Sequence, residues 1–540
     1  MMKKYTFLIL ILFMLPLVVA AQKKNEAPIQ AGADYAIVDT RQGKVRGYTR
    51  NGIFTFKGIP YAKAERFEAP LQPDSWEGIR SSMTYGPVCP IEPTSSVNDE
   101  FEFVFQHNWG YHNEENCLNL NVWTQGIQDG KKRPVMVWLH GGGFSAGSSI
   151  ELPSYDGENL SKNGDVVLVS VNHRLNVLGF LDMSAYGDKY KGSANAGLLD
   201  LVAALEWVRD NIEQFGGDPS NVTIFGQSGG GGKVTSLMSS PKAKGLFHKA
   251  IVQSGSYVRN FTDPAVAQKV SAAILEELNI PAGEVEKLQE VPYLELNAAA
   301  RVAQKKVEEA LKAEGKEGVG LGWGPVLDGD FLPYHPYEDA AMALSQDVPL
   351  LVGSTKTEFM PFRPDSRGIS MEEAKARLQE QYKSKTEAYL AAVKKAYPNT
   401  TLPSDYIDID LRFRAGVIKQ ADMKATKGKA PVYSYMFSWE SPVMGGVFKS
   451  MHCMELPFVF DNISRCQEMT GGGAEAHALA QKMSQAWISF AKTGNPNHAG
   501  LPRWPEYTPK NGANMIFDNK CEVKNHHDGE LLQIALGDNF

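Results

Sequence analysis

Positive charge is in short supply in this sequence, and no basic patch is present. Lys and Arg number 55 against 62 Asp and Glu, which gives a formal net charge of −7 at pH 7. A mildly acidic chain of this kind is a poor nucleic-acid binder and a poor candidate for an anionic membrane surface. Beyond residue 21 the sequence also lacks a membrane-spanning apolar run, an internal repeat and a low-complexity tract. We therefore expect no nucleic-acid partner and no stable membrane anchor.

Cysteine is scarce as well, with five residues in 540. An odd number leaves at least one thiol unpaired within the chain. No cysteine follows the apolar leader at residues 1–21, so we do not expect a lipid-anchored lipoprotein. The five are Cys89, Cys117, Cys453, Cys466 and Cys521.

The leader itself has the pattern of a signal peptide. Two lysines precede the apolar segment Tyr5–Val19, and small residues lie before the expected cleavage site at Gln22. The apolar segment of about 15 residues is shorter than the ~20 that a spanning helix needs, although a membrane anchor is the alternative. We predict a periplasmic or secreted protein with a signal peptide at 1–21 and a disordered polar segment at 22–35.

The composition is that of an ordinary globular protein, with 43% hydrophobic and 22% charged residues. Apolar strands at Pro134–Leu139, Val166–Val171 and Val222–Phe225 alternate with helical patterns such as Ala196–Phe215. Such alternation predicts an α/β fold with a large, mostly parallel sheet flanked by helices. We expect a single domain over residues 36–540, with long N-terminal loops up to Asn113 and a helical insert at about Asp263–Lys316.

The strand at Val222–Phe225 leads directly into Gly226-Gln227-Ser228-Gly229-Gly230, and a helix-compatible stretch follows. Strand, Gly-Xaa-Ser-Xaa-Gly and helix form the context of a nucleophile elbow, in which the serine hydroxyl is presented at the edge of the sheet. The motif alone arises by chance about 0.3 times in a chain of this composition. Residues 143–147 also fit it, but no helix follows Ser145. We therefore predict Ser228 as the nucleophile.

A serine nucleophile needs a histidine base, and the base needs an acid. His452 follows the predicted strand Val432–Trp439, and Glu358 lies just beyond the strand Pro349–Gly353. Asp328 and Asp330 are alternative acids, and the pair His526-His527 before Asp528 is read as an exposed polar tail rather than a metal site. From the residues alone, six further histidines after Ser228 remain candidates: His248, His335, His477, His498, His526 and His527.

A glycine run supplies the other part of the predicted site. His140-Gly141-Gly142-Gly143 follows the strand Pro134–Leu139, so backbone N–H groups are exposed with no side chain in the way. Together with the N–H of Gly229 they can bind an oxyanion, and losing one such donor costs about 3–4 kcal/mol of transition-state stabilisation.

Taken together, these residues resemble the type-B carboxylesterase/lipase family, which includes the cholinesterases. The resemblance extends from about Ala36 to Phe517. Further similar segments are Glu115–Val122, Asn195–Asp200, Phe215–Pro219, Gly245–Phe247, Gln253–Gly255 and Gly494–Pro496.

The resemblance implies an α/β-hydrolase fold and a serine carboxylester hydrolase that needs neither cofactor nor metal and acts on a small-molecule ester. It implies Ser228 as nucleophile, Glu358 as acid and His452 as base. The implied oxyanion hole comprises the N–H groups of Gly142, Gly143 and Gly229. It also implies a disulfide between Cys89 and Cys117, while a Cys453–Cys466 pair is a separate hypothesis.

Three residues depart from the family pattern. Gln227 stands where the family usually has Glu, Gly229 where it has Ala, and Asn116 where it has Asp. Gln227 removes a negative charge, which argues against a cationic, choline-like substrate. Candidate residues of the substrate pocket are Trp109, Phe144, Gln227, Leu321 and Trp323.

Two other functions remain as alternatives. A lipase needs a large apolar lid, whereas the loop between Cys89 and Cys117 is rich in acidic residues. A neuroligin-like binding protein usually lacks a member of the triad, and this chain has all three. The ester itself and the oligomeric state are left open by the sequence.

Overall fold

The computed structural model describes residues 28–92, 99–256, 261–316 and 321–537. The predicted signal peptide at 1–21 lies outside these residues. Part of the segment 22–35, which we predicted to be disordered, is described. Gln30 exchanges two backbone hydrogen bonds with Thr49, of 3.0 and 2.9 Å, and the hydroxyl of Tyr35 contacts both side chains. Gln30 thus pairs with the edge strand that contains Thr49.

The described residues form one eleven-stranded sheet, in the order β14-β13-β12-β11-β10-β9-β7-β8-β6-β4-β3. From β8 to β13 neighbouring strands are parallel, and the strands at both edges are antiparallel to their neighbours. The predicted parallel α/β sheet is confirmed. The strands are β3 (Tyr48–Arg50), β4 (Ile53–Pro60), β6 (Asn119–Thr124), β7 (Arg133–Leu139), β8 (Val167–Val171), β9 (Gly217–Gln227), β10 (Lys249–Gln253), β11 (Leu350–Thr355), β12 (Val432–Phe437), β13 (Ala513–Phe517) and β14 (Glu522–Asn525). A small second sheet joins β1 (Ile37–Asp39), β2 (Lys44–Arg46) and β5 (Ile79–Ser81).

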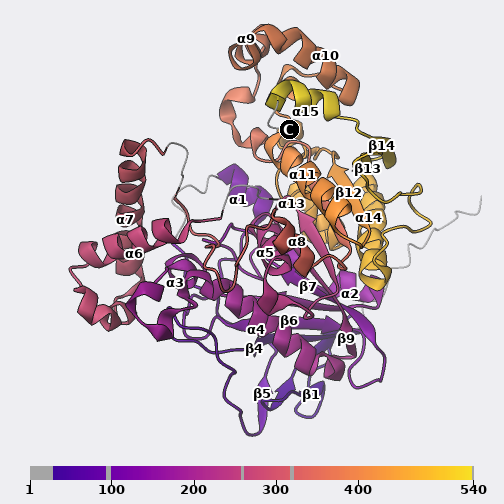
Figure 1. The fold of residues 1–540 in the computed structure, drawn as a ribbon. Helices are drawn as coiled ribbons and strands as arrows, with labels where there is room; N and C mark the ends of the chain where they lie inside the picture. Colours follow the sequence, from indigo (N-terminus) through magenta and orange to yellow (C-terminus); the bar gives the residue numbers. More distant parts are fainter. Residues whose placement is uncertain (1–27, 93–98, 257–260, 317–320, 538–540) are drawn as a thin grey trace, which may run out of the picture.

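Helices cover both faces of the large sheet (Figure 1). Along β7, Val135 and Val137 belong to the hydrophobic core on one face, whereas Met136 and Trp138 belong to the core on the other. This alternation follows from the two-residue period of a strand, and it explains why the strand is apolar throughout. Each fully buried large side chain contributes about 1.5–3 kcal/mol to stability. The helices on the Val135 face include α4 (Ala196–Asn211), α5 (Gly229–Met238) and α11 (Arg412–Lys427), and those on the Trp138 face include α2 (Glu158–Gly164), α12 (Leu456–Val459), α13 (Gln467–Thr470) and α14 (Ala474–Thr493).

The predicted helix at Ala196–Phe215 is α4 followed by a 3₁₀ turn at Ile212–Phe215. Gly216 ends it with a φ of 73°, in the left-handed region where glycine has no steric penalty. The predicted insert contains α6 (Pro264–Glu277) and α7 (Tyr293–Ala313), which pack together beside the sheet (Figure 1). The remaining helices are α1 (Asp99–Phe105), α3 (Asn176–Phe180), α8 (Asp339–Leu344), α9 (Met371–Tyr382), α10 (Thr386–Ala396) and α15 (Gly529–Leu536).

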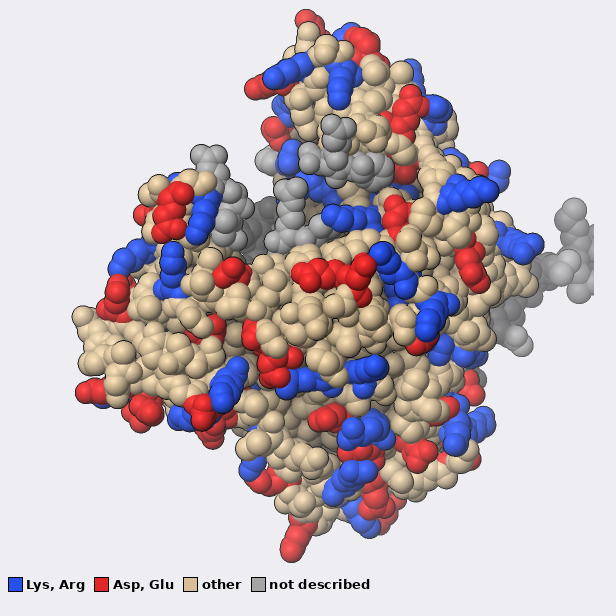
Figure 2. Space-filling model, viewed as in Figure 1, with Lys and Arg blue, Asp and Glu red and all other residues tan. Residues whose placement is uncertain are grey.

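The surface agrees with the charge composition. Figure 2 shows Lys and Arg interspersed with Asp and Glu over the visible face, and they do not gather into one basic patch there. Within the residues described, no helix has the length and apolar character required to cross a bilayer.

Candidate active site

Ser228 occupies a sharp turn between the end of β9 and the start of α5. Its φ and ψ are 56° and −126°, a sparsely populated conformation for a residue with a side chain. Two backbone hydrogen bonds hold this turn, from Ser228 N to Gln253 O at 2.8 Å and from Gly232 N to Ser228 O at 3.0 Å. The predicted strand, elbow and helix are therefore present.

The glycines of the elbow pack closely against the neighbouring backbone. A Cβ placed on Gly229 would lie 2.1 Å from the carbonyl oxygen of Gly143, and one on Gly230 would lie 2.0 Å from that of Leu139. Both distances are far below van der Waals contact. The first turn of α5 thus packs directly on the segment that follows β7, which brings Gly229 next to the predicted oxyanion loop.

The oxyanion loop itself is a tight turn. Gly142 and Gly143 have φ values of 79° and 65°, which favour glycine. The N–H of Ala146 donates to the carbonyl of Gly142 at 3.0 Å and closes the turn. The three glycines predicted to form the oxyanion hole, Gly142, Gly143 and Gly229, are therefore neighbours in space.

Glu358 and His452 are brought together by adjacent strands. Glu358 follows β11 and His452 lies on the loop after β12, and these two strands are parallel neighbours. The Nδ1 atom of His452 is hydrogen-bonded to Oε2 of Glu358, and both side chains are buried. Within the described part of the chain, no other pair of the candidate histidines and acids forms such a contact beside the elbow.

The carboxylate of Glu358 is fixed on its other side as well. Its Oε1 atom accepts hydrogen bonds from Ser254 Oγ at 2.7 Å and from the N–H of Thr355 at 2.8 Å. Ser254 follows β10 just as Ser228 follows β9, so neighbouring strand ends supply the whole arrangement. These donors hold the carboxylate in a fixed orientation.

Gln227 contacts the imidazole instead of lining an open pocket. Its side chain is fully buried, and its amide Nε2 lies 3.3 and 3.2 Å from Nδ1 and Nε2 of His452. Its Oε1 accepts a hydrogen bond from Cys453 Sγ at 3.3 Å. Gln227, which we predicted to line the substrate pocket, is thus in contact with the imidazole of His452.

A series of aromatic rings, each in contact with the next, extends from His452 to Trp109. The ring of Phe359 lies 4.1 Å from that of His452, with 30° between their planes, and Phe359 is 46% exposed. Sequence reasoning missed Phe359, although it directly follows Glu358. The series continues through the pairs Phe359–Phe362, Phe362–Phe101, Phe101–Phe105, Phe105–His107 and His107–Trp109, with centroids 4.5–6.1 Å apart.

The other predicted pocket residues lie apart from this series. Phe144 packs edge-on against Phe180, with ring centroids 5.3 Å apart. Leu321 and Trp323 line a cavity beside Phe180 of about 20 Å³, roughly the space of one water molecule. As it stands, that cavity is too small to hold an ester.

With this geometry in place, the comparisons with known proteins are decisive. Residues 34–534 match the sequence profile of the Carboxylesterase family. The chain belongs to this family. The para-nitrobenzyl esterase of Bacillus subtilis (strain 168) is 38% identical over 507 residues, which cover 92% of this chain and 98% of that protein. Human cocaine esterase is 33% identical, with coverages of 84% and 82%.

Solved structures lead to the same family. An esterase from Clostridium hathewayi, described as able to hydrolyse aliphatic aromatic polyesters, superposes with a TM-score of 0.83 at 40% identity, covering 93% of this chain and 98% of that one. A carboxylesterase of Geobacillus stearothermophilus gives 0.73 at 37% identity, with coverages of 92% and 99%. This carboxylesterase is thus a carboxylic ester hydrolase with the α/β-hydrolase fold.

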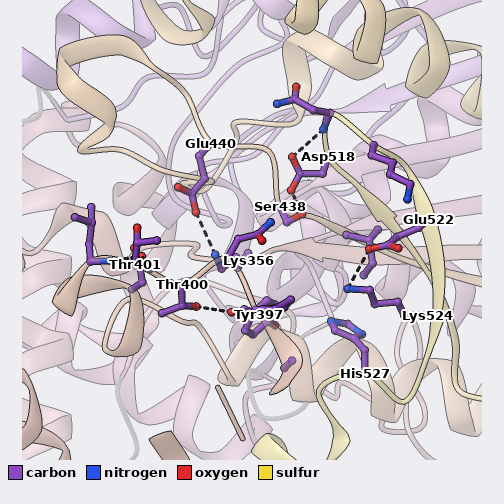
Figure 3. A pocket seen from close by; sticks show the side chains of 18 residues that line it. Lys356, Tyr397, Thr400, Thr401, Ser438, Glu440, Asp518, Glu522, Lys524 and His527 are labelled. Atoms are coloured by element: carbon purple, nitrogen blue, oxygen red, sulfur yellow. Dashed lines mark hydrogen bonds and ion pairs between the residues drawn. The ribbon is translucent and has the colours of Figure 1, made fainter. Parts of the chain in front are cut away.

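This esterase also has a larger cavity, shown in Figure 3. Its volume is about 550 Å³, and its lining includes Lys356, Glu440, Lys524 and His527 but none of the residues Ser228, Glu358 and His452. Ion pairs such as Lys356–Glu440 and Lys524–Glu522 already satisfy much of its charge. We do not assign the ester-cleaving chemistry to it. The described residues contain no cluster of His, Cys, Asp and Glu able to hold a metal ion, His526 and His527 included.

All five cysteines are thiols in this structure. Cys89 and Cys117, which the resemblance paired, are both buried, and a hydrogen bond with Cys89 together with burial raises the pKa of Cys117. The predicted disulfide is thus not formed here, although the two thiols are in contact. Cys453 contacts Gln227, and Cys466 is likewise unpaired.

Proposed function

We propose that this esterase cleaves its substrate through an acyl-enzyme, with Ser228 as nucleophile, His452 as base and Glu358 as the acid that orients the base. The observation that carries the proposal is the buried contact of His452 Nδ1 with Glu358 Oε2 next to the strained elbow at Ser228. When Nδ1 donates to Glu358, Nε2 carries no proton and is the ring nitrogen that can act as the base.

The reaction then has two halves. Ser228 Oγ attacks the ester carbonyl carbon as its proton passes to His452 Nε2, and the carbonyl oxygen becomes an oxyanion. The tetrahedral intermediate collapses, the bond to the alcohol oxygen breaks, and the alcohol leaves with the proton from His452. Water attacks the acyl-enzyme by the same route and releases the acid. The N–H groups of Gly142, Gly143 and Gly229 stabilise the oxyanion in both halves.

We further propose that the substrates carry an aromatic or bulky apolar group. The half-exposed ring of Phe359 lies against the proposed base, and the ring series leads from it to Trp109. A flat ring of a substrate gains stacking contacts against an exposed ring such as that of Phe359. The relatives support this proposal, since two of them are named for para-nitrobenzyl and cocaine substrates. We also infer export of the protein from the leader at residues 1–21.

Two serine variants test the mechanism. Ser228→Ala should abolish hydrolysis of a para-nitrophenyl ester and covalent labelling by a fluorophosphonate probe. Ser145→Ala is the matched control, because Ser145 lies in the second Gly-Xaa-Ser-Xaa-Gly sequence, and it should retain both. Turnover by Ser228→Ala at the parent rate would exclude Ser228 as the nucleophile.

A further inference from the structure

Lys233 is buried directly behind the proposed oxyanion loop. It lies on α5 one turn beyond Gly229 and Gly230, and its side chain is completely inaccessible to solvent. Its ammonium donates a 2.9 Å hydrogen bond to the carbonyl oxygen of His140. His140 is the residue between the end of β7 and the glycine run 141–143.

A lysine in this position is costly to the fold. Lysine is almost never fully buried unless it is paired, because its charge must be taken out of water. Burial lowers the pKa of Lys233 to about 7. Among the described residues, the negative charge of Glu151 opposes this effect. The imidazoles of His140 and His173, stacked 5.1 Å apart, are held neutral by burial and by Lys233. Because burial of Lys233 destabilises the fold, we expect its ammonium group to have a function.

The role follows from what the ammonium holds. A run of three glycines has many accessible backbone conformations, so its N–H groups point at an oxyanion only if the run is fixed at both ends. At its far end, the glycine run packs at Gly143 directly against the backbone of α5 at Gly229, so it cannot move in that direction. At the start of the run, the hydrogen bond from Lys233 fixes the peptide group of His140.

We propose that Lys233 is a positioning residue of the oxyanion hole, which orients the N–H groups of Gly142 and Gly143 through the carbonyl of His140. This inference rests on the proposed function. It predicts that loss of the ammonium weakens binding of the transition state while binding of the ester itself is retained, because pre-organised donors act on charge that develops during the reaction.

The experiment compares Lys233→Met with Lys424→Met. Methionine has a similar volume and length but cannot donate a hydrogen bond. Lys424 is the matched control: it is also buried, its ammonium also donates to a backbone carbonyl, that of Ser345, and burial lowers its pKa to about 8. It lies on α11, away from the oxyanion loop. Both variants are measured for unfolding, for kcat and KM with a para-nitrophenyl ester, and for inhibition by an aryl boronic acid.

Lys233→Met should lower kcat at least about tenfold, though less than the ~10²- to 10³-fold loss of an oxyanion donor itself, and leave KM within about twofold. Inhibition by the boronic acid, whose adduct with serine places an oxygen in the oxyanion hole, should weaken by a similar factor. Lys424→Met should change neither.

An unchanged kcat in folded Lys233→Met would overturn the inference. So would a loss of activity that matches the unfolded fraction or that Lys424→Met shares. These results leave the proposed function intact as long as Ser228→Ala is inactive. If Ser228→Ala is active, the proposed function itself fails, so the two failures are distinguishable.

Discussion

Glu358 and His452 are joined twice, once through their side chains and once through their backbones. Besides the contact of Nδ1 with the carboxylate, the N–H of His452 donates to the carbonyl of Glu358 at 2.9 Å. Glu358 also forms a parallel β-bridge with Met451. The two loops that carry the proposed acid and base are therefore fixed to each other, so the imidazole has little freedom to turn away from the carboxylate.

Glu358→Gln should consequently remove the charge and leave the framework intact. The amide cannot stabilise the imidazolium or hold the required tautomer, so kcat for a para-nitrophenyl ester should fall by about 10³- to 10⁴-fold. Glu440→Gln is the control, since Glu440 pairs with Lys356 on the neighbouring loops outside the proposed site, and it should stay within about twofold. A drop below tenfold for Glu358→Gln would mean that another group orients His452.

Much of this site could be predicted because its parts have local signatures. The elbow, the glycine run and the apolar strands are consequences of short-range sterics and of burial on both faces, which a few consecutive residues encode. His452 was one of several histidines by position alone, and the family resemblance selected it. The structure adds the reason, since the loops after two adjacent parallel strands must meet at one edge of the sheet.

Other features depend on packing between distant segments and have no local signature. The amide of Gln227 contacts the imidazole of a residue 225 positions away. The stacking of Phe359 on His452 and the pairing of Gln30 with Thr49 are of the same kind. No local pattern marks Lys233 as buried, and only the three-dimensional fold reveals it.

Although the family usually has Ala at this position, Gly229→Ala should disturb the oxyanion loop of this chain, which packs directly on Gly229. The added methyl group would lie 2.1 Å from the carbonyl oxygen of Gly143, so the loop must move. Overpacking of this kind costs about 1–3 kcal/mol of stability, and misplaced N–H donors should lower kcat at least about tenfold. Gly283→Ala is the control, because a Cβ there meets open space and the backbone needs no positive φ. Full activity of Gly229→Ala would show that Gly143 moves freely.

Phe359→Ala should alter selectivity more than stability. Loss of the ring next to His452 removes a stacking surface worth about 0.5–1.5 kcal/mol, so kcat/KM for an aryl ester should fall by about 2- to 12-fold. An ethyl ester of a short acid should be affected less. Phe359→Leu keeps an apolar side chain without an aromatic face and should show the same selective loss. Equal losses for both esters would contradict the proposed aromatic preference.

Cys89 and Cys117 should form a disulfide if the protein is exported to an oxidising compartment. Their thiols are already in contact, and closing this loop would add about 3–4 kcal/mol of stability in the chain-entropy model. Intact mass measured without reductant should then be lower by two hydrogens. Cys117→Ser should lower the urea midpoint relative to the oxidised protein but much less relative to the reduced one. Two free thiols in the exported protein would exclude the bond.

Glu455 should make stability depend on pH. It is fully buried, and burial together with the charge of Glu358 raises its pKa to about 8, while Oε1 accepts a hydrogen bond from Gln253 at 3.3 Å. Its pKa in the unfolded chain is about 4.3, so between about pH 4.3 and 8 the folded protein holds a proton that the unfolded chain has lost. Stability therefore falls as pH rises through this window, by up to about 1.4 kcal/mol per pH unit, and levels off above pH 8.

Glu455→Gln removes this titration while it preserves the shape of the side chain. The difference in free energy of unfolding between Glu455→Gln and the parent protein should thus shift in favour of the variant as pH rises from 5 to 8, and stay constant from 8 to 9. Urea unfolding at a series of pH values measures this difference, and the other titrating groups cancel in the comparison because both proteins share them. A difference that does not change with pH would mean that Glu455 is ionised in the folded protein, with its charge balanced inside the core.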